Sequence, residues 1–182
     1  MISSGKYNRM PELETERLIL RRIQKEDTDA IFECWMRDED VSRYMFWKAS
    51  DDRKEAEEFV TFELENQSNS QWNRWLIETK DSKTIVGTCL IFYNDEEGHW
   101  DISYNLGKKY WGKGFITEAM QTVMRYAKEK LNMTYCETTC ARENVASAHV
   151  LEKLGFVFRE YAPYECNGGT IKTTGKRYVW SR

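Results

Sequence analysis

The chain has 182 residues, of which 41% are hydrophobic and 14% aromatic, and its formal net charge is -3. A chain of this length forms one compact domain, and one so rich in aromatic residues is not intrinsically disordered. The near balance of acidic and basic residues argues against a protein that coats nucleic acid, because neutralising phosphates requires a basic face. No run of about eighteen apolar residues occurs, so the sequence predicts no membrane-spanning helix.

Cysteine and histidine usage suggests a reducing compartment and no structural metal. The five cysteines are an odd number, which suits free thiols. Cys136 and Cys140 lie in a β-branched stretch that we interpret as a strand, where four residues span about 13 Å, too far for a disulfide. With two histidines and no CxxC motif, a zinc site is not expected. The polar segment 1–14 lacks the features of a signal peptide, so we expect a cytoplasmic protein.

The first half of the chain predicts a strand, two helices and a three-stranded meander. Apolar periodicity places these elements at 17–22 (strand), 26–37 and 51–67 (helices), and 72–79, 84–93 and 99–106 (strands). Short turns that contain Asp, Asn and Gly separate the last three strands, which indicates antiparallel pairing.

The second half predicts alternating strands and helices. After a glycine-containing loop come a helix over 115–131, a strand over 134–140, a short helix over 144–154, and strands over 156–164 and 176–180 joined by a long loop. The whole pattern predicts an α+β fold, a mixed sheet of about seven strands covered by helices. We expect residues 1–14 to form an N-terminal extension and residues 15–182 a single domain.

The loop KKYWGKGF between a predicted strand and a predicted helix is the most informative stretch. Gly112 and Gly114 allow the backbone to approach a ligand closely, and the first amides of the following helix lack intrahelical acceptors. Such a helix start binds phosphate, and Lys109 and Lys113 add positive charge. The dinucleotide fingerprint is not met, because Thr117 stands where its third glycine would be. By themselves, the glycines fit a plain turn as well as a binding site.

Four motifs in order along the chain resemble the Gcn5-related N-acetyltransferase (GNAT) superfamily. Lys109-x-x-Gly112-x-Gly114 resembles its pyrophosphate-binding loop, although that pattern has Gln or Arg at the lysine. The stretch from Asn144 to Phe156 resembles its second landmark. The stretches TERLILR and WGKGFITEA resemble the ribosomal-protein N-acetyltransferase-like branch (RimJ/RimL-type). The resemblance covers nearly the whole chain.

This resemblance implies a GNAT fold, with a central, mostly antiparallel twisted sheet and helices on both faces. It implies an acetyl-CoA-dependent N-acetyltransferase that moves an acetyl group to the primary amine of a protein N-terminus or a small molecule by direct attack in a ternary complex. Leu151 stands where superfamily members often carry a general-acid tyrosine, so a CoA-binding regulatory module without turnover is an alternative. The implied partners are acetyl-CoA and an amine acceptor, without nucleic acid or membrane, for a monomer or homodimer.

The resemblance also assigns coenzyme-binding residues to three segments of the chain. These are Tyr104, Asn105, Leu106, Lys109, Gly112, Lys113, Gly114, Phe115, Ile116, Thr117 and Asn144. The backbone near residues 104–106 is expected to bind the pantetheine arm and to polarise the acetyl carbonyl. Asn144 could hydrogen-bond the coenzyme, cap the short helix, or do both.

Two residues are candidates for the proton transfers that acetyl transfer needs. Asp101 falls where relatives often have an acidic general base, although an ordinary solvent-facing aspartate on a strand is an equal reading. Ser147 is the candidate proton relay to the sulfur, and a serine hydrogen-bonded to its own helix is the alternative. No metal ligands are predicted.

An aromatic stretch after the first helix is the candidate acceptor site. Tyr44, Phe46 and Trp47 lie where the family has a loop that lines the acceptor. Aromatic residues also belong to hydrophobic cores, so each could have that role instead.

Overall fold

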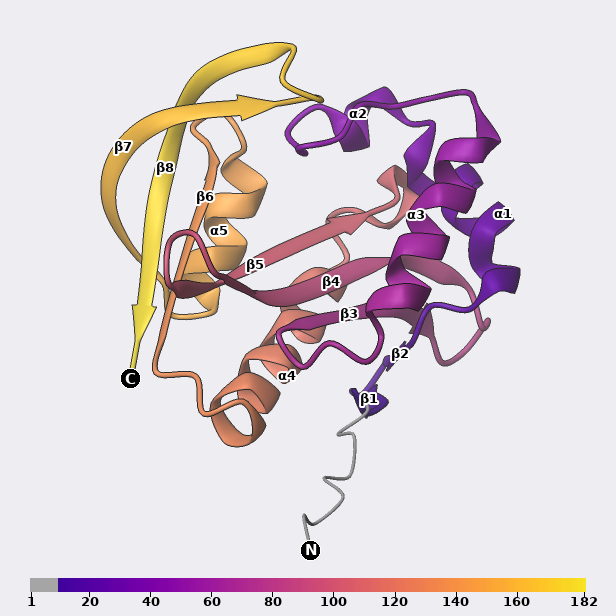
Figure 1. Cartoon of the computed structure of the whole chain (residues 1–182), viewed down its shortest axis with the longest axis horizontal. Helices are drawn as coiled ribbons and strands as arrows, with labels where there is room; N and C mark the ends of the chain where they lie inside the picture. Colours follow the sequence, from indigo (N-terminus) through magenta and orange to yellow (C-terminus); the bar gives the residue numbers. More distant parts are fainter. Residues whose placement is uncertain (1–9) are drawn as a thin grey trace, which may run out of the picture.

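The computed structural model describes residues 10–182. In that part of the chain the strands form one eight-stranded sheet, and the helices pack against it (Figure 1). The strand order is β1-β2-β3-β4-β5-β6-β8-β7, and every neighbouring pair is antiparallel except β5 and β6. The strands are β1 (Leu13–Glu14), β2 (Leu18–Arg21), β3 (Trp72–Thr79), β4 (Ile85–Asn94), β5 (His99–Leu106), β6 (Tyr135–Ala141), β7 (Val157–Cys166) and β8 (Ile171–Ser181).

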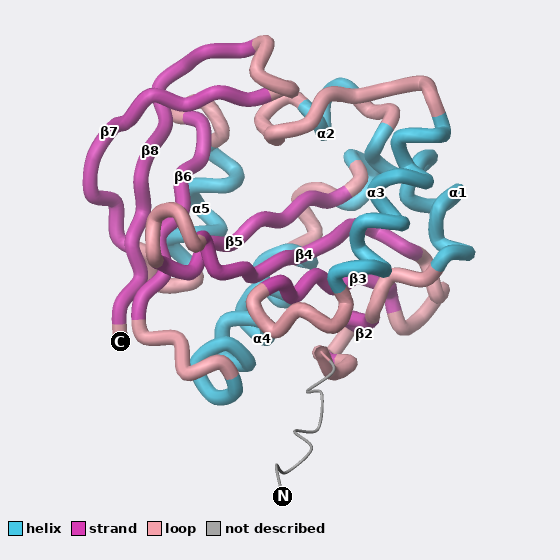
Figure 2. The backbone as a smooth tube through the Cα atoms, in the orientation of Figure 1, coloured by secondary structure: helices cyan, strands magenta, loops and turns pink. Residues whose placement is uncertain are grey.

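Helices cover both faces of the sheet, as the sequence predicts. They are α1 (Thr28–Ile31), α2 (Glu39–Ser42), α3 (Arg53–Asn66), α4 (Phe115–Lys130) and α5 (Val145–Lys153). Figure 2 shows α1 and α3 at the right of the view and α4 below the strands. Across the described residues, no helix combines the length and apolar character needed to cross a membrane.

Two apolar clusters hold the helices on the sheet because adjacent strand residues point to opposite faces. Trp75 and Ile77 of β3 belong to the larger cluster, which includes the buried face of α4. Leu76 of the same strand belongs to the smaller cluster, with Ile31 of α1 and Val60 of α3. The mixed α/β fold with helices on both faces is therefore confirmed.

The sheet has eight strands where the sequence predicts about seven. The additional strand, β1, pairs with β2 and lies in the segment that we assigned to an N-terminal extension. Met10 is buried in the core, and the carbonyl of Pro11 accepts a hydrogen bond from Nε1 of Trp75 at 2.8 Å. Residues 10–14 therefore pack against the domain. The rest of the expected extension lies outside the described residues.

The helix predicted over 26–37 is present as one uninterrupted helical stretch over 25–36, whose hydrogen-bond pattern changes along its length. A 3₁₀ turn (Lys25–Asp27), α1 and a π-helical turn (Phe32–Met36) follow one another. Asp38 then adopts an extended conformation and caps α2, its side chain accepting from the N–H groups of Asp40 and Val41. Extended backbone at residue 38 ends the helix, so one continuous helix cannot reach the next segment. The apolar spacing remains correct, because it reports only which side chains face the core.

The C-terminal hairpin is longer, and its loop shorter, than predicted. Strand β8 begins at Ile171 instead of residue 176, and residues 167–170 form the whole turn. Asn167, Gly168 and Gly169 adopt positive φ angles of 51°, 62° and 78°, which tighten this turn. The polar, threonine-rich start of β8 has no apolar alternation, so periodicity did not reveal it as a strand.

The sheet divides between β5 and β6. Their parallel pairing has a single registered pair, Trp100 with Cys136, after which the two strands diverge. From Tyr104 to Leu106, β5 is paired with β4 on one edge and has no registered β6 partner on the other. The Leu106 carbonyl already accepts a hydrogen bond from Nε1 of Trp111 at 2.9 Å. The other outer backbone groups there are available to a ligand, because strand edges carry unpaired N–H and C=O groups.

A buried polar chain crosses the face of the sheet that α3 covers. The guanidinium of Arg74 donates to Glu63 Oε1 at 2.6 Å and to the hydroxyl of Thr88 at 3.3 Å. The Thr88 hydroxyl donates in turn to Asn105 Oδ1 at 2.8 Å. The amide nitrogen of Asn105, Nδ2, is buried without a hydrogen-bond partner in the described structure. These hydrogen-bonded side chains therefore link α3 to β5, the strand that borders the divergence.

We predict that Arg74→Leu lowers the free energy of unfolding by about 3–5 kcal/mol, because it leaves the buried carboxylate of Glu63 without its counter-charge. Urea denaturation measures this loss. Arg37→Leu is the matched control: Arg37 pairs with exposed Glu33 and Asp51, so its loss should cost less than about 1 kcal/mol. Equal losses in the two variants would contradict the assigned role of the buried pair.

Candidate functional site

A cavity of about 440 Å³ lies at the divergence of β5 and β6. Its walls come from β4, β5, β6, β7 and the loop that follows α2. Aromatic side chains form much of the lining: Tyr44, Phe46, Trp72, Phe92, Tyr104 and Tyr164. The charged and titratable lining residues are Glu97, His99, Asp101, Glu137 and Arg177.

The β7–β8 hairpin closes one side of this cavity. The N–H of Asn167 donates to the carbonyl of Met45 at 2.6 Å, and the Tyr164 hydroxyl donates to the carbonyl of Tyr44 at 3.2 Å. Figure 1 shows the tip of the hairpin reaching the segment beside α2. Two parts of the chain more than a hundred residues apart therefore share a wall of the cavity.

The glycine loop leads directly into the N-terminus of α4. Gly112 and Gly114 have φ angles of 72° and 77°, a region that residues with a Cβ rarely adopt. Gly114 is the N-cap of α4, and no side chain caps the helix. The first-turn amides of α4 therefore remain open at the positive end of the helix dipole, a geometry that binds anions.

Arg17 fixes this loop from the neighbouring edge of the sheet. Its guanidinium donates to the carbonyl of Lys113 at 3.0 Å and forms an ion pair with Glu118 at 2.7 Å. It also lies 4.7 Å from the centre of the Phe115 ring. Arg17 was not a candidate in the sequence analysis, because it is separated from the loop by almost a hundred residues and belongs to a different predicted element.

The three lysines of the loop differ in their surroundings. Lys108 forms an ion pair with Asp40 of α2, whereas Lys113 has its ammonium 5.4 Å from the centre of the Tyr110 ring. Lys109 and Lys113 are both exposed, so their charges are available to an anion at the start of α4.

Tyr104 and Ser147 meet across the divergence. The Tyr104 hydroxyl lies 2.9 Å from Ser147 Oγ and also donates to the Ser147 carbonyl at 3.2 Å. Burial raises the pKa of Tyr104, so its hydroxyl keeps its proton at neutral pH. Asn144 is the N-cap of α5, and its side chain accepts from the N–H of Ser147 at 3.1 Å. The capping alternative for Asn144 is therefore realised in the structure.

Asp101 lies in the cavity wall with a perturbed pKa. Burial raises its pKa to about 6, while the Thr138 hydroxyl and the N–H of Ile102 oppose this shift. The Ile102 N–H donates to Asp101 Oδ1 at 2.6 Å, which fixes the carboxylate. A carboxylate with this pKa is mostly ionised at pH 7 and can accept a proton, as a general base requires.

The structure brings together some of the predicted acceptor residues. Tyr44 and Phe46 line the cavity together with Asp101, and the ring of Phe46 is 65% exposed. Trp47 instead packs against the smaller core cluster, which includes Trp35. The side chain of Asn105 faces the buried polar chain, so only its backbone borders the divergence.

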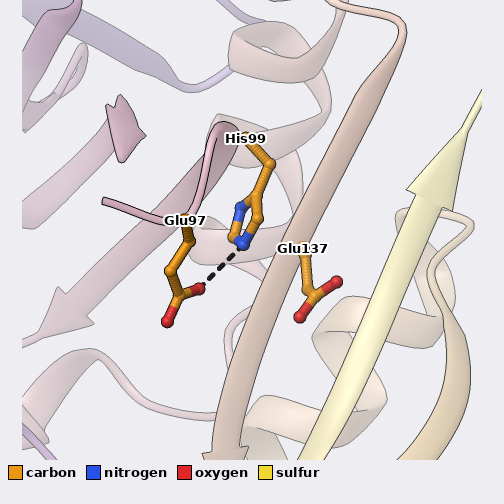
Figure 3. Close-up of side chains that lie close together, drawn as sticks. All are labelled: Glu97, His99 and Glu137. Atoms are coloured by element: carbon orange, nitrogen blue, oxygen red, sulfur yellow. Dashed lines mark hydrogen bonds and ion pairs between the residues drawn. The ribbon is translucent and has the colours of Figure 1, made fainter. Parts of the chain in front are cut away.

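A titratable cluster that the sequence did not reveal lies at one end of the cavity (Figure 3). Nε2 of His99 lies 2.8 Å from Glu97 Oε2, and Glu137 approaches from β6. Each of the three residues offers one possible ligand atom, and these atoms all lie within 4.8 Å of one another, a spacing that could hold a metal ion. However, Glu137 is paired with Arg177 at 3.2 Å and accepts from the Tyr135 hydroxyl, so a cation already balances this carboxylate.

Comparison with known proteins relates the chain to acetyltransferases. The acetyltransferase (GNAT) domain family matches residues 17–157. An uncharacterized N-acetyltransferase of Bacillus licheniformis, p20, is 34% identical over 148 residues, which cover 81% of this chain and 83% of that protein.

Solved structures share the fold. The microcin self-immunity acetyltransferase MccE, solved with acetyl-CoA and AMP, has a TM-score of 0.81 at 16% identity, covering 92% of this chain and 93% of MccE. RimL, a ribosomal alpha-N-protein acetyltransferase solved with coenzyme A, has a TM-score of 0.79 at 16% identity, covering 96% and 98% of the two chains.

We predict that Asp101→Asn is more stable than the natural chain at pH 8, by about 2 kcal/mol, and that the difference disappears toward pH 4. The folded pKa of about 6 lies above the unfolded value near 4, so the natural chain loses stability as the pH rises between them. Denaturant unfolding across this pH range measures the effect. Asp95→Asn, at an exposed turn, is the control and should show no such trend. A stability difference for Asp101→Asn that is the same at every pH would refute the assignment.

Proposed function

The chain belongs to the GNAT family of acetyltransferases, and on this premise we propose that it transfers the acetyl group of acetyl-CoA directly to the primary amine of an acceptor in a ternary complex. The observation that carries this proposal is the divergence of β5 and β6 beside the uncapped start of α4, with Asp101 and Ser147 on its walls. This arrangement offers a phosphate site, a slot for an extended arm and two proton-transfer groups in one place.

The diphosphate of the coenzyme is proposed to bind at the start of α4. The open amides from Phe115 to Thr117 would donate to its oxygens, and Lys109 and Lys113 would add charge. The substitution of lysine for the usual Gln or Arg at position 109 leaves the backbone donors intact. MccE and RimL, which share the fold, were solved with acetyl-CoA and coenzyme A, respectively.

The pantetheine arm is proposed to run along the free edge of β5. Backbone groups between Tyr104 and Leu106 have no registered partner on β6, and apart from the Leu106 carbonyl, which accepts from Trp111, those on this edge can pair with the amides of the arm and polarise the acetyl carbonyl. The acetyl group then lies between the acceptor cavity and the start of α5. Holding the amine and the thioester in this geometry supplies much of the acceleration.

Proton transfers are assigned to the two sides of the thioester. An alkylamine with a pKa near 10.4 is protonated at neutral pH, so Asp101 accepts its proton, directly or through water, and frees the lone pair for attack. The tetrahedral intermediate then collapses, the C–S bond breaks and the thiolate leaves. The nitrogen gives up its second proton to water as the amide forms. Ser147 passes a proton to the sulfur and regains one from the Tyr104 hydroxyl, with which it shares a hydrogen bond, and water restores the proton to that pair. Ser147 and Tyr104 are thus proposed to act as the general acid, a role that a tyrosine often has in relatives at the position of Leu151.

We predict that Gly114→Glu abolishes the stabilisation of the protein by acetyl-CoA, because it places bulk and negative charge at the proposed diphosphate site. Thermal denaturation with and without acetyl-CoA measures the effect. Gly98→Glu is the matched control: Gly98 has a similar φ of 74° and open space around it, so it bears the same backbone strain away from α4. If acetyl-CoA stabilises Gly114→Glu as much as Gly98→Glu, the proposed coenzyme site is wrong.

We predict that Asp101→Asn lowers kcat by about 10²-fold or more, because the amine loses its base, while the affinity for acetyl-CoA stays unchanged. Release of coenzyme A thiol measures turnover, and the natural enzyme should lose activity as the pH falls below about 6, where Asp101 becomes protonated. Ser147→Ala should lower kcat less, because the Tyr104 hydroxyl remains beside the sulfur, and Ser147→Ala with Tyr104→Phe should lower it further.

Asp95→Asn removes the same charge from an exposed turn and serves as the control, with unchanged kcat and pH profile. Natural-level turnover by Asp101→Asn would remove Asp101 from the mechanism. A double variant no slower than Ser147→Ala would remove Tyr104.

A further inference from the structure

The acceptor cavity carries more negative than positive charge. Arg177 faces two carboxylates, Glu137 at 3.2 Å and Glu160 at 3.2 Å, so its own charge is more than balanced. Asp101 contributes another negative charge and makes no ion pair among the described residues, although His99 on the same strand lies close enough to act on it. Glu97 is paired only with His99. Even with a protonated His99, the group retains a net negative charge.

Both ring nitrogens of His99 lie beside hydrogen-bond acceptors. Nδ1 lies 3.1 Å from the carbonyl of Trp100 and Nε2 lies 2.8 Å from Glu97. Both neighbours are acceptors, so a neutral ring satisfies only one of them and the other contact requires an added proton. Figure 3 shows the ring between the two glutamates. A ligand ammonium placed beside Glu97 would meet a carboxylate whose only ion-pair partner among the described residues is this ring.

The spacing along β5 separates this cluster from the proposed base. His99 and Asp101 are two residues apart on one strand, so their side chains point to the same face about 7 Å apart. Aromatic rings, among them Trp72 and Phe92, whose centroids lie 5.4 Å apart, form the wall beside them. Aromatic faces accommodate both alkyl chains and ammonium groups.

We propose that the acceptor is an amine that carries a second positive charge, such as an alkyl diamine, with its reacting nitrogen at Asp101 and its second ammonium at Glu97 and His99. This inference rests on the proposed function and specifies its substrate class. The alkyl chain between the nitrogens lies against the aromatic wall. An acceptor with a carboxylate in place of the second ammonium would meet Glu97 and is disfavoured.

A metal ion at Glu97, His99 and Glu137 is the competing occupant. The ion pair of Glu137 with Arg177 opposes it, because an added divalent cation would lie close to the guanidinium. An ammonium needs only Glu97 and leaves that ion pair in place. The structure therefore favours the organic cation.

The experiment compares cadaverine with pentylamine, which has the same chain and lacks the second ammonium. We expect kcat/KM for cadaverine to exceed that for pentylamine by about tenfold, beyond the statistical gain from two equivalent amines. The ω-amino acid of the same length should be poorer than pentylamine. Glu97→Gln should remove most of the cadaverine preference, whereas Glu96→Gln, which deletes the neighbouring charge of the same turn outside the cavity, should retain it.

Calorimetric binding of both amines to the protein saturated with coenzyme A gives a readout that does not depend on turnover. Tighter binding of cadaverine that is lost in Glu97→Gln supports the inference even if neither amine is acetylated, an outcome that would count against the proposed function alone. Equal kcat/KM and equal affinity for the two amines overturn the inference and leave the acetyltransferase proposal standing. A preference that survives Glu97→Gln, or that disappears on treatment with EDTA, also overturns it.

Discussion

The divergence of β5 from β6 is the constraint on which the site depends. A parallel pair that stops after one registered contact leaves a strand edge open inside the domain, which a fully paired sheet would not provide. The domain can keep this open edge because each flanking strand is fully hydrogen-bonded on its other edge. Strand β5 pairs with β4 along its whole length, and β6 pairs with β8 along its whole length. Each half of the sheet is therefore supported by its own fully registered neighbour, so the open edge does not depend on pairing across the gap.

The fold could be predicted from the sequence because its signals are local. The strand-forming runs of β3 to β5, separated by turn residues, and the apolar stripe of α4 each report a single element. Local signals failed where the outcome depends on a distant segment. The two-residue strand β1 exists only because β2 and Trp75 lie beside it, and the polar start of β8 becomes a strand because β7 pairs with it. No periodicity in either segment records that partner.

The residues of the candidate site also divide into those with a local sequence signal and those placed there by a distant segment. The glycine loop could be identified from the sequence because the positive φ angles at positions 112 and 114 favour glycine there, and the order of the motifs indicates the family. Arg17, Tyr164 and Arg177 act at the site from elements remote in sequence, and each is an ordinary polar residue in its own segment. Trp47 illustrates the converse: it is adjacent to cavity residues in the chain, yet its side chain packs in the core on the other side of the loop.

Charge placement connects the scaffold to the proposed chemistry. Arg74 and Glu63 neutralise each other deep beneath α3, so the cost of burying them is compensated internally and no net charge is left under the sheet. At the cavity the balance is different, because the carboxylates outnumber the cations that face them. An excess of negative charge in a partly buried wall raises the free energy of the unliganded protein. Burial of the Asp101 carboxylate, which raises its pKa to about 6, adds a desolvation cost of its own. A cationic acceptor relieves the charge excess on binding, and the neutral amide product no longer does so at the reacting nitrogen. Under the proposed function, the same charge excess that would attract the protonated amine would therefore also favour release of its acetylated form.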